Sequence, residues 1–226
     1  MQAYNPYIVN YTEYPPYNHL IGNHTKRFCI NHGSTDNLKG KIMSVVACRV
    51  DRNGFEIASD SITVRGYTQT KGQTSTYSKL YEANSIVVGS VGYAEENSLF
   101  RLFVETHHPT QANENSLLEF MAEFSDWKKK RTDRGNIDNS YMIGFSGSIY
   151  TVEAWHVERI KSYMAIGAGM NFALAALHLG NTARKAVETA IELSIYCEAP
   201  VIVIKKSAQQ RLAAKQEQTR RNRKVK

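Results

Sequence analysis

Three pairs of short apolar segments, each joined by a tight turn, constrain the fold of this chain more than any other feature. Strand-length segments on either side of an Asn-Gly dipeptide or a similar turn are typical of β-hairpins. The predicted hairpins are 45–50 with 55–58, 77–83 with 86–91, and 141–145 with 149–154, and further strands are predicted at 163–166 and 201–204. We therefore expect antiparallel sheets.

Helical periodicity fills the gaps between these strands. Helices are predicted at 99–105 and 116–131, after the second hairpin, and at 172–179 and 183–195, before the last strand. Their apolar stripes are typical of core contacts. The stripes include Leu117, Phe120, Met121 and Phe124 in the second helix and Ala183, Val187, Ala190, Ile191 and Ile195 in the fourth. This order predicts an α+β fold, a layered sandwich of two antiparallel sheets flanked by helix pairs.

The net charge of +7 belongs mainly to the C-terminal end. Residues 205–226 contain nine Lys or Arg and one acidic residue, Glu217, which leaves about −1 for residues 1–204. We interpret 205–226 as a solvated basic tail. The alternative is a tail that binds nucleic acid, which would show steeply salt-dependent binding. We do not expect nucleic acid as a partner of the rest of the chain.

Residues 1–43 differ from the rest in composition. Five Tyr and three of the five Pro lie within the first 17 residues, and no helical or strand period persists. We interpret 1–43 as an N-terminal extension, either a propeptide or a mis-annotated segment. It contains His19, His24, Cys29 and His32, which match no tight zinc-binding spacing, so we expect no metal and no cofactor.

The remaining composition suggests a soluble, cytoplasmic protein without a membrane partner. No apolar segment approaches the length of a membrane span, and the first residues lack a signal peptide. Cys29, Cys48 and Cys197 are an odd, widely spaced set, which we interpret as reduced thiols.

Met43 and Ser44 lie immediately before the first predicted strand. Removal of Met43 would make Ser44 the amino-terminal residue, with Asp60 one hairpin away. A terminal hydroxyl residue carries a nucleophile and a base together, because its own α-amine can accept the hydroxyl proton. Ser44 is therefore the candidate nucleophile.

The order of elements and several short sequences resemble the proteasome β-subunit family, and the HslV-type peptidases in particular. The resemblance covers about residues 44–204, and its strength lies in the order and spacing of the matching sequences. These are Ile57-Ala58-Ser59-Asp60-Ser61, Gly89-Ser90-Val91-Gly92, Ala165-Ile166-Gly167-Ala168-Gly169 with Phe172-Ala173, and Ile195-Tyr196. The resemblance implies the four-layer αββα sandwich of the N-terminal nucleophile hydrolases.

The resemblance also implies roles for individual residues. Ser44 matches the N-terminal threonine of the family, and Asp60 matches its aspartate. The backbone amide of Gly92 matches the oxyanion donor, and Ser90 lies near the position that lines the primary specificity pocket.

The catalytic lysine of the family has two possible counterparts. Counting forward from Asp60 without gaps reaches Thr76, which would leave the site without a cation. Counting backward from Gly89 with a shorter turn at Asn84-Ser85 reaches Lys79, and turn length varies readily. We favour Lys79. Its ammonium group would lower the proton affinity of the Ser44 amine and pair with Asp60.

Three positions depart from the pattern of the family. Ala168 replaces a serine that helps to order the nucleophile, and Ser194 replaces an aspartate that many β-subunits carry. Ser44 itself lacks the methyl group of threonine, which restricts the rotamer. These changes suggest a slower or an inactive site.

The start of the mature chain has two possible origins. Self-cleaving propeptides of the family usually end in glycine, whereas Ile42-Met43 precede Ser44 here. Translation from Met43, followed by methionine removal as in HslV-type enzymes, would expose Ser44 directly. We favour this second route.

Besides the alternative of a nucleic-acid-associated protein that uses the basic tail, the sequence supports two function hypotheses. The first is a peptidase with a serine-type N-terminal nucleophile, which hydrolyses peptides or unfolded proteins inside a homo-oligomeric ring. The resemblance implies the ring and an unfolding ATPase as a partner. The second is a catalytically inactive relative that keeps the sandwich for assembly.

Overall fold

The computed structural model describes residues 43–52, 54–65, 68–70 and 76–207, and the account below is confined to them. The extension up to residue 42, with its His and Cys residues, and the tail after residue 207 lie outside this part of the chain.

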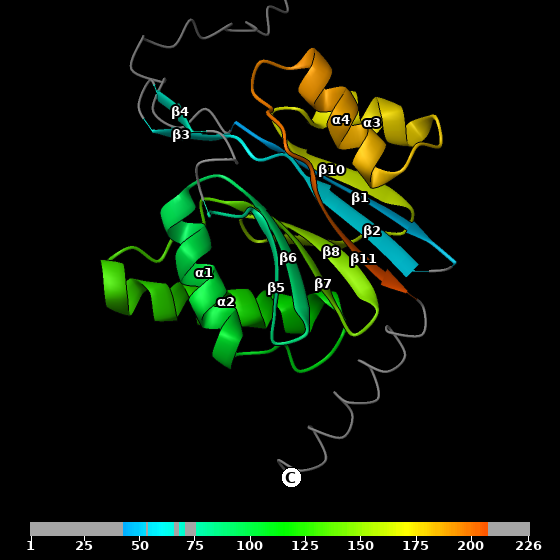
Figure 1. Ribbon diagram of the computed structural model, residues 1–226. Coiled ribbons are helices and arrows are strands. Elements are labelled where there is room, and N and C mark those ends of the chain that lie inside the picture. The colour runs from blue at the N-terminus through cyan, green and yellow to red at the C-terminus, as the bar shows by residue number, and fades with distance from the viewer. Residues whose placement is uncertain (1–42, 53, 66–67, 71–75, 208–226) are drawn as a thin grey trace, which may run out of the picture. The chain divides into compact units, whose positions relative to one another are not determined.

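One sheet contains the first hairpin and the last strand, which are far apart in sequence (Figure 1). Its antiparallel strands follow the order β10-β1-β2-β11, with β10 at Tyr163–Gly167, β1 at Val45–Asp51, β2 at Gly54–Ser59 and β11 at Ile202–Ser207. Because side chains alternate along a strand, Val45 and Ala47 face the helices, whereas Val46 and Cys48 face the other sheet.

The second sheet is an antiparallel meander in the order β5-β6-β7-β8-β9. Its strands are β5 at Leu80–Ala83, β6 at Ile86–Val91, β7 at Ser140–Phe145, β8 at Ser148–Glu153 and β9 at His156–Arg159. A small separate ribbon pairs β3 at Thr63–Arg65 with β4 at Thr68–Thr70.

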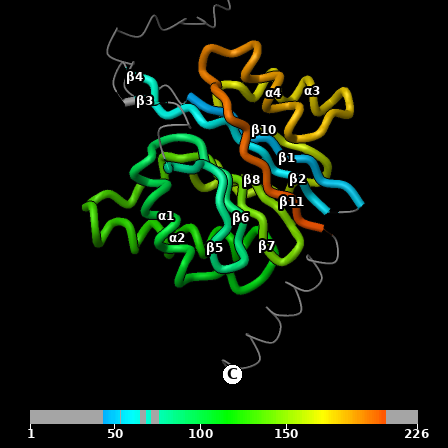
Figure 2. The backbone as a smooth tube through the Cα atoms, in the orientation of Figure 1, coloured from blue at the N-terminus to red at the C-terminus, as the bar shows by residue number. Residues whose placement is uncertain are grey.

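Helices cover the outer face of each sheet (Figures 1 and 2). The meander is covered by α1 at Ala94–Thr106 and α2 at Glu114–Thr132, and the other sheet is covered by α3 at Met170–His178 and α4 at Ala183–Leu193. Each helix pair forms an apolar cluster with its sheet, and a third cluster fills the space between the sheets. The predicted α+β four-layer αββα sandwich is thus confirmed.

Several predicted elements need correction. Helix α1 begins at Ala94 rather than at residue 99, and α4 ends at Leu193, so Ile195 lies outside the helix and is 85% exposed. We missed strand β9, because its mostly exposed side chains give no apolar alternation. The ribbon of β3 and β4 escaped prediction because each of its strands has only three residues, too few to show a period. Strand β11 continues to Ser207, past the predicted end at residue 204.

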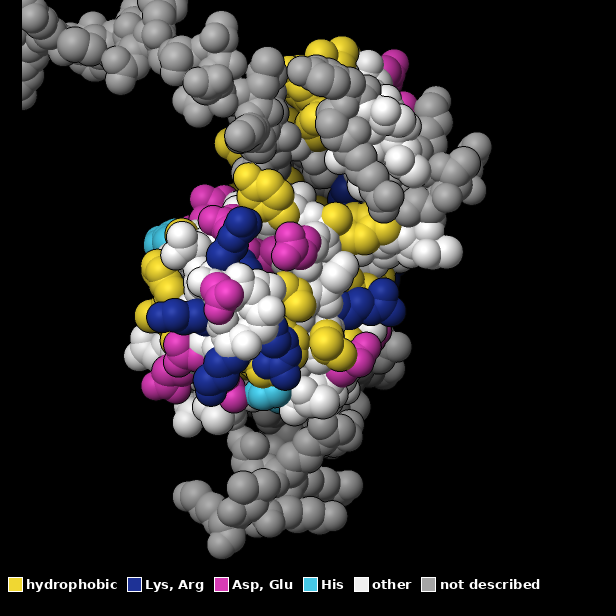
Figure 3. Space-filling model, turned by 90° about the vertical axis from the view of Figure 1, so that its left-hand side faces the viewer, with side chains coloured by type: hydrophobic (Ala, Val, Ile, Leu, Met, Phe, Trp, Pro, Cys, Tyr) yellow, Lys and Arg dark blue, Asp and Glu magenta, His cyan; other side chains and the backbone are white. Residues whose placement is uncertain are grey.

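The surface of the described residues carries charges of both signs. On the face shown in Figure 3, Lys and Arg side chains lie among Asp and Glu side chains. Within the same part of the chain, no helix combines the length and the apolar character that crossing a membrane requires.

Candidate functional site

Asp60 follows the end of strand β2, where its carboxylate is completely buried and accepts hydrogen bonds at both oxygens. Oδ1 accepts from the Lys79 ammonium at 2.9 Å and from the backbone N–H of Val45 at 3.0 Å. Oδ2 accepts from the backbone N–H groups of Ile62 and Glu198, both at 3.2 Å. A buried carboxylate needs this many donors to offset its lost hydration.

Lys79 lies immediately before β5 and reaches across from the meander to the other sheet. Its side chain is 6% exposed, and burial lowers the pKa of Lys79 while the Asp60 carboxylate opposes that shift. Thr76, the alternative counterpart of the family lysine, is exposed. The ion pair with Asp60 is therefore made by the residue that the shorter-turn alignment selects.

Ser44 is buried immediately before β1, next to Val45, whose N–H donates to Asp60. Its carbonyl accepts a hydrogen bond from the Gly169 N–H at 3.2 Å, and a Cβ at Gly167, where φ is +98°, would overlap the same carbonyl. The φ angle of Ser44 is +150°, a conformation that residues with a side chain rarely adopt. Ser44 is thus held tightly on its carbonyl side and strained on its amino side.

Gly92 forms the exposed turn between β6 and α1. Its φ angle is +136°, and a Cβ at this position would overlap the side-chain oxygen of Asn139, so only glycine fits without rearrangement. Ser90, two residues earlier, is buried, and its N–H donates to the Lys79 carbonyl at 2.9 Å. Ser90 therefore contacts the backbone of Lys79.

Besides Ser44, the two other departures from the family pattern have different surroundings. Ala168 is exposed, between the two glycines that contact the Ser44 carbonyl. Ser194 is buried at the end of α4, where its hydroxyl accepts from the Tyr196 N–H at 3.2 Å. Position 168 therefore offers no hydroxyl next to the nucleophile, whereas Ser194 stabilises a turn.

Sequence reasoning missed the contribution of the segment after α4. The Glu198 amide binds Asp60, and burial together with the Asp60 charge raises the pKa of the Cys197 thiol to about 11. Burial also raises the pKa of Cys48. Both cysteines are therefore protonated thiols at neutral pH, and both are free and buried, in agreement with their interpretation as reduced thiols.

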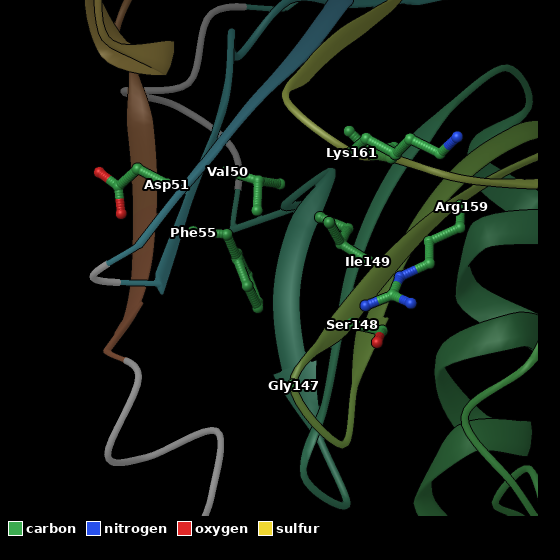
Figure 4. A pocket seen from close by; sticks show the side chains of 9 residues that line it. Val50, Asp51, Phe55, Gly147, Ser148, Ile149, Arg159 and Lys161 are labelled. Atoms are coloured by element: carbon green, nitrogen blue, oxygen red, sulfur yellow. The ribbon is translucent and has the colours of Figure 1, made fainter.

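No group of three or more His, Cys, Asp or Glu side chains could hold a metal ion within the described part of the chain. A cavity of about 280 Å³ is lined by Phe55, Ile149, Arg159 and neighbouring residues (Figure 4). It also touches Val50 and Asp51, at the end of β1 away from Ser44, so it is separate from the candidate site.

Comparisons with known proteins identify the fold. No protein-family model matches the sequence, and no curated protein matches it either. The structure is similar to BPH of Thiobacillus denitrificans in complex with epoxomicin, with a TM-score of 0.66 and 17% identity over 72% of this chain and 98% of that chain.

Two Anbu structures are also similar. Anbu (ancestral β-subunit) from Yersinia bercovieri gives a TM-score of 0.55 and 14% identity over 74% of this chain and 83% of that chain. The helical assembly of the Anbu complex from Pseudomonas aeruginosa gives a TM-score of 0.55 and 15% identity over 72% of this chain and 81% of that chain. The chain thus has the proteasome-like fold of the N-terminal nucleophile hydrolases.

Proposed function

We propose that this chain is a proteasome-like endopeptidase of the HslV type, with Ser44 as a serine-type N-terminal nucleophile. The observation that carries the proposal is the position of the Asp60 Oδ1 atom. This one oxygen binds both the Lys79 ammonium and the amide of Val45, the residue that follows Ser44. A cation held in a buried place beside a terminal hydroxyl residue is what nucleophile activation requires.

The backbone of Ser44 supports removal of the segment before it. A φ angle of +150° costs roughly 1–3 kcal/mol for a residue with a side chain. A terminal residue has no φ torsion, because no carbonyl carbon precedes its nitrogen. Cleavage or methionine removal before Ser44 would therefore relieve this strain and release the α-amine.

The proposed reaction needs only this chain and water. The Ser44 hydroxyl attacks the peptide carbonyl carbon while its proton passes to the α-amine, and the Gly92 amide stabilises the resulting oxyanion. The peptide C–N bond breaks as the proton moves to the leaving nitrogen, which leaves an ester on Ser44. Water then adds to the ester carbonyl, its proton passes through the same amine to the Ser44 oxygen, the C–O bond to Ser44 breaks, and the carboxylic acid product leaves. The cation at Lys79 keeps the amine unprotonated between these steps.

Similar proteins support an oligomeric assembly for this proposal. The Anbu complex from Pseudomonas aeruginosa forms a helical assembly. We propose that this chain likewise acts in a homo-oligomer, a ring in the cytoplasm, with an unfolding ATPase delivering unfolded protein. Size-exclusion chromatography with light scattering tests the assembly, and a monomer at micromolar concentration contradicts it.

Covalent labelling by an epoxyketone tests the nucleophile. BPH of Thiobacillus denitrificans binds epoxomicin, which is a peptide epoxyketone. An epoxyketone has two electrophilic carbons, and a terminal Ser44 offers both a hydroxyl and an amine. Protein expressed from Met43 should begin at Ser44 by intact-mass analysis and form a one-to-one adduct that peptide mapping places on Ser44.

Matched lysine variants provide the control. Lys79→Ala should slow labelling by about 100-fold or more, because the amine then stays protonated. Lys206→Ala should label at the wild-type rate, since Lys206 makes a partly exposed ion pair with Glu82 at 2.6 Å. Labelling of a residue other than Ser44, or equal rates in the two variants, would refute the mechanism.

An inactive assembly protein is the second candidate, and Ala168 favours it. Position 168 lies between two residues that contact the nucleophile, yet it supplies no hydroxyl. Absence of labelling in an assembled preparation that begins at Ser44 would support this alternative.

A further inference from the structure

We propose that Asn139 and Glu96 are positioning residues that hold the Gly92 amide in its oxyanion-binding orientation. The proposal rests on the proposed function for its catalytic consequence. Its structural part stands on contacts of the described residues.

The Gly92 turn needs an external restraint. Strand β6 ends at Val91 and holds the chain up to that residue, and α1 begins two residues after Gly92. The Gly92 N–H belongs to the planar peptide group between Val91 and Gly92. Glycine has the widest range of backbone conformations, so the Gly92 end of this group is held only as firmly as the residues that follow it. The side chain of Tyr93, the N-cap residue of α1, makes no capping hydrogen bond. The restraint must therefore come from elsewhere in the chain.

Asn139, 46 residues further along the chain, supplies this restraint from the segment before β7. Its Oδ1 accepts from the Tyr93 N–H at 2.6 Å, and its Nδ2 donates to the Tyr93 carbonyl at 2.9 Å. One carboxamide thus binds both backbone polar groups of Tyr93, and it occupies the space that a Cβ at Gly92 would need. This two-point contact fixes Tyr93 and thereby holds the backbone on the C-terminal side of Gly92.

Asn139 is in turn fixed by Glu96, a buried carboxylate in the first turn of α1. Glu96 Oε1 accepts from the Asn139 N–H at 3.0 Å and from the Tyr141 hydroxyl at 2.9 Å. Oε2 accepts from the Asp138 N–H at 3.1 Å and from the Lys128 ammonium. The four donors come from α2, from β7 and from the segment before β7.

The charges around Glu96 favour a positioning role over a ligand site. A cavity of about 210 Å³ lies beside the pair of Glu96 and Lys128. Lys128 already donates to Glu96 and to the Asn136 carbonyl, so the only buried cation that lines this cavity is occupied. A fully bonded buried pair holds its geometry rigidly, because each broken contact would leave a polar group without a partner.

A displaced Gly92 amide should destabilise the transition state of the reaction. The oxyanion forms only during the reaction, so a displaced Gly92 amide should lower kcat while leaving the affinity for uncharged substrate nearly unchanged. Loss of one oxyanion donor typically costs 100- to 1,000-fold in rate, and misorientation of a donor that is still present should cost less. We expect about 10- to 100-fold for Asn139→Ala.

The matched comparison uses two capping asparagines. Asn113 caps α2 by accepting from the Ser116 N–H at 2.8 Å, and it makes no contact with Gly92 among the described residues. Asn139→Ala and Asn113→Ala each remove one asparagine carboxamide next to a helix start. Only the former should weaken binding of a peptide boronate, which becomes an anionic tetrahedral adduct, by about tenfold or more. Glu96→Gln should produce a smaller shift of the same kind.

Hydrogen exchange separates failure of this proposal from failure of the proposed function. The Tyr93 amide should exchange about tenfold faster in Asn139→Ala than in the wild type, whether or not the protein cleaves peptides. An unchanged Tyr93 exchange rate overturns the positioning role. So does equal loss of boronate and product-peptide affinity, or a kcat that matches that of Asn113→Ala. A wild type that fails to label at Ser44 removes the catalytic function, and the exchange experiment then decides the structural part alone.

Discussion

Substitutions of the two partners of the Asp60–Lys79 ion pair should destabilise the fold to different extents. Lys79 donates to Asp60, and Asp60 also accepts from three backbone amides. Asp60→Asn leaves a buried ammonium group uncompensated and places an amide group among N–H donors. Lys79→Met leaves a carboxylate that still accepts three hydrogen bonds. We therefore expect Asp60→Asn to be the more destabilising change.

The magnitudes follow from this inequality. Removal of one partner of a buried pair costs about 3–5 kcal/mol when the other charge is left bare, which is the expectation for Asp60→Asn. Lys79→Met should cost about 1–3 kcal/mol, the range for a lost hydrogen bond to a charged group. The double variant should lose about 1–3 kcal/mol less unfolding free energy than the sum of the two single losses, because it contains no uncompensated ammonium group.

The pH dependence of the free energy of unfolding provides a check on this comparison. Burial lowers the pKa of Lys79, so the unfolded chain binds more protons than the folded chain below the ordinary lysine value of 10.5. The free energy of unfolding therefore rises with pH in this window. In Asp60→Asn the opposing carboxylate charge is absent, so the pKa of Lys79 in the folded chain falls further. The pH range over which the free energy of unfolding rises therefore becomes wider. Asp60→Asn should thus approach the wild-type stability as the pH is raised from 7 towards 10, whereas the deficit of Lys79→Met should not shrink.

Urea unfolding monitored by circular dichroism at several pH values measures all three variants. Glu82→Gln, which breaks the partly exposed pair with Lys206, is the control and should cost less than about 1 kcal/mol. Strict additivity in the double variant would sink this reasoning. A larger loss for Lys79→Met than for Asp60→Asn would do the same.

Three further predictions concern single positions. Gly92→Ala should unfold at a clearly lower temperature and lose Ser44 labelling, because the added Cβ would overlap Asn139 and the φ angle of +136° disfavours a residue with a side chain. An active variant that is as stable as the wild type would contradict the turn geometry. Ala168→Ser should raise the rate of epoxyketone labelling by about fivefold, the effect of one added hydrogen bond, and an unchanged rate would show that position 168 does not reach the nucleophile. Burial and the Glu96 charge raise the pKa of Tyr141 well above 10.0, so above pH 10 the folded chain keeps a proton that the unfolded chain loses. The wild type should therefore lose its stability advantage over Tyr141→Phe as the pH rises above 10. An advantage that grows there contradicts the direction of the pKa shift.

The layers of the fold were predictable because they depend on local patterns. Apolar alternation and turn dipeptides located the hairpins, and helical periodicity located most of α2, as the match of Ser116 to Arg131 with Glu114–Thr132 illustrates. Strand β9 was missed because its side chains are exposed or half-buried on both faces, so its sequence has no apolar alternation. Helix α4 was extended too far, since Ile195 continues the helical spacing although the chain has already left the helix at Ser194.

The start of α1 shows why parts of the site lie beyond sequence reasoning. Helix starts are recognised from a capping side chain at the N-cap, and Tyr93 offers none, so the first five residues of the helix escaped prediction. The cap exists, but Asn139 provides it across the fold. The same holds for Glu198, whose amide binds the Asp60 carboxylate from 138 residues further along the chain. Local propensity cannot encode such contacts, because their energy depends on two segments arriving together. In a sandwich whose two sheets must both supply the site, the groups that orient the chemistry are therefore expected where sequence patterns are weakest.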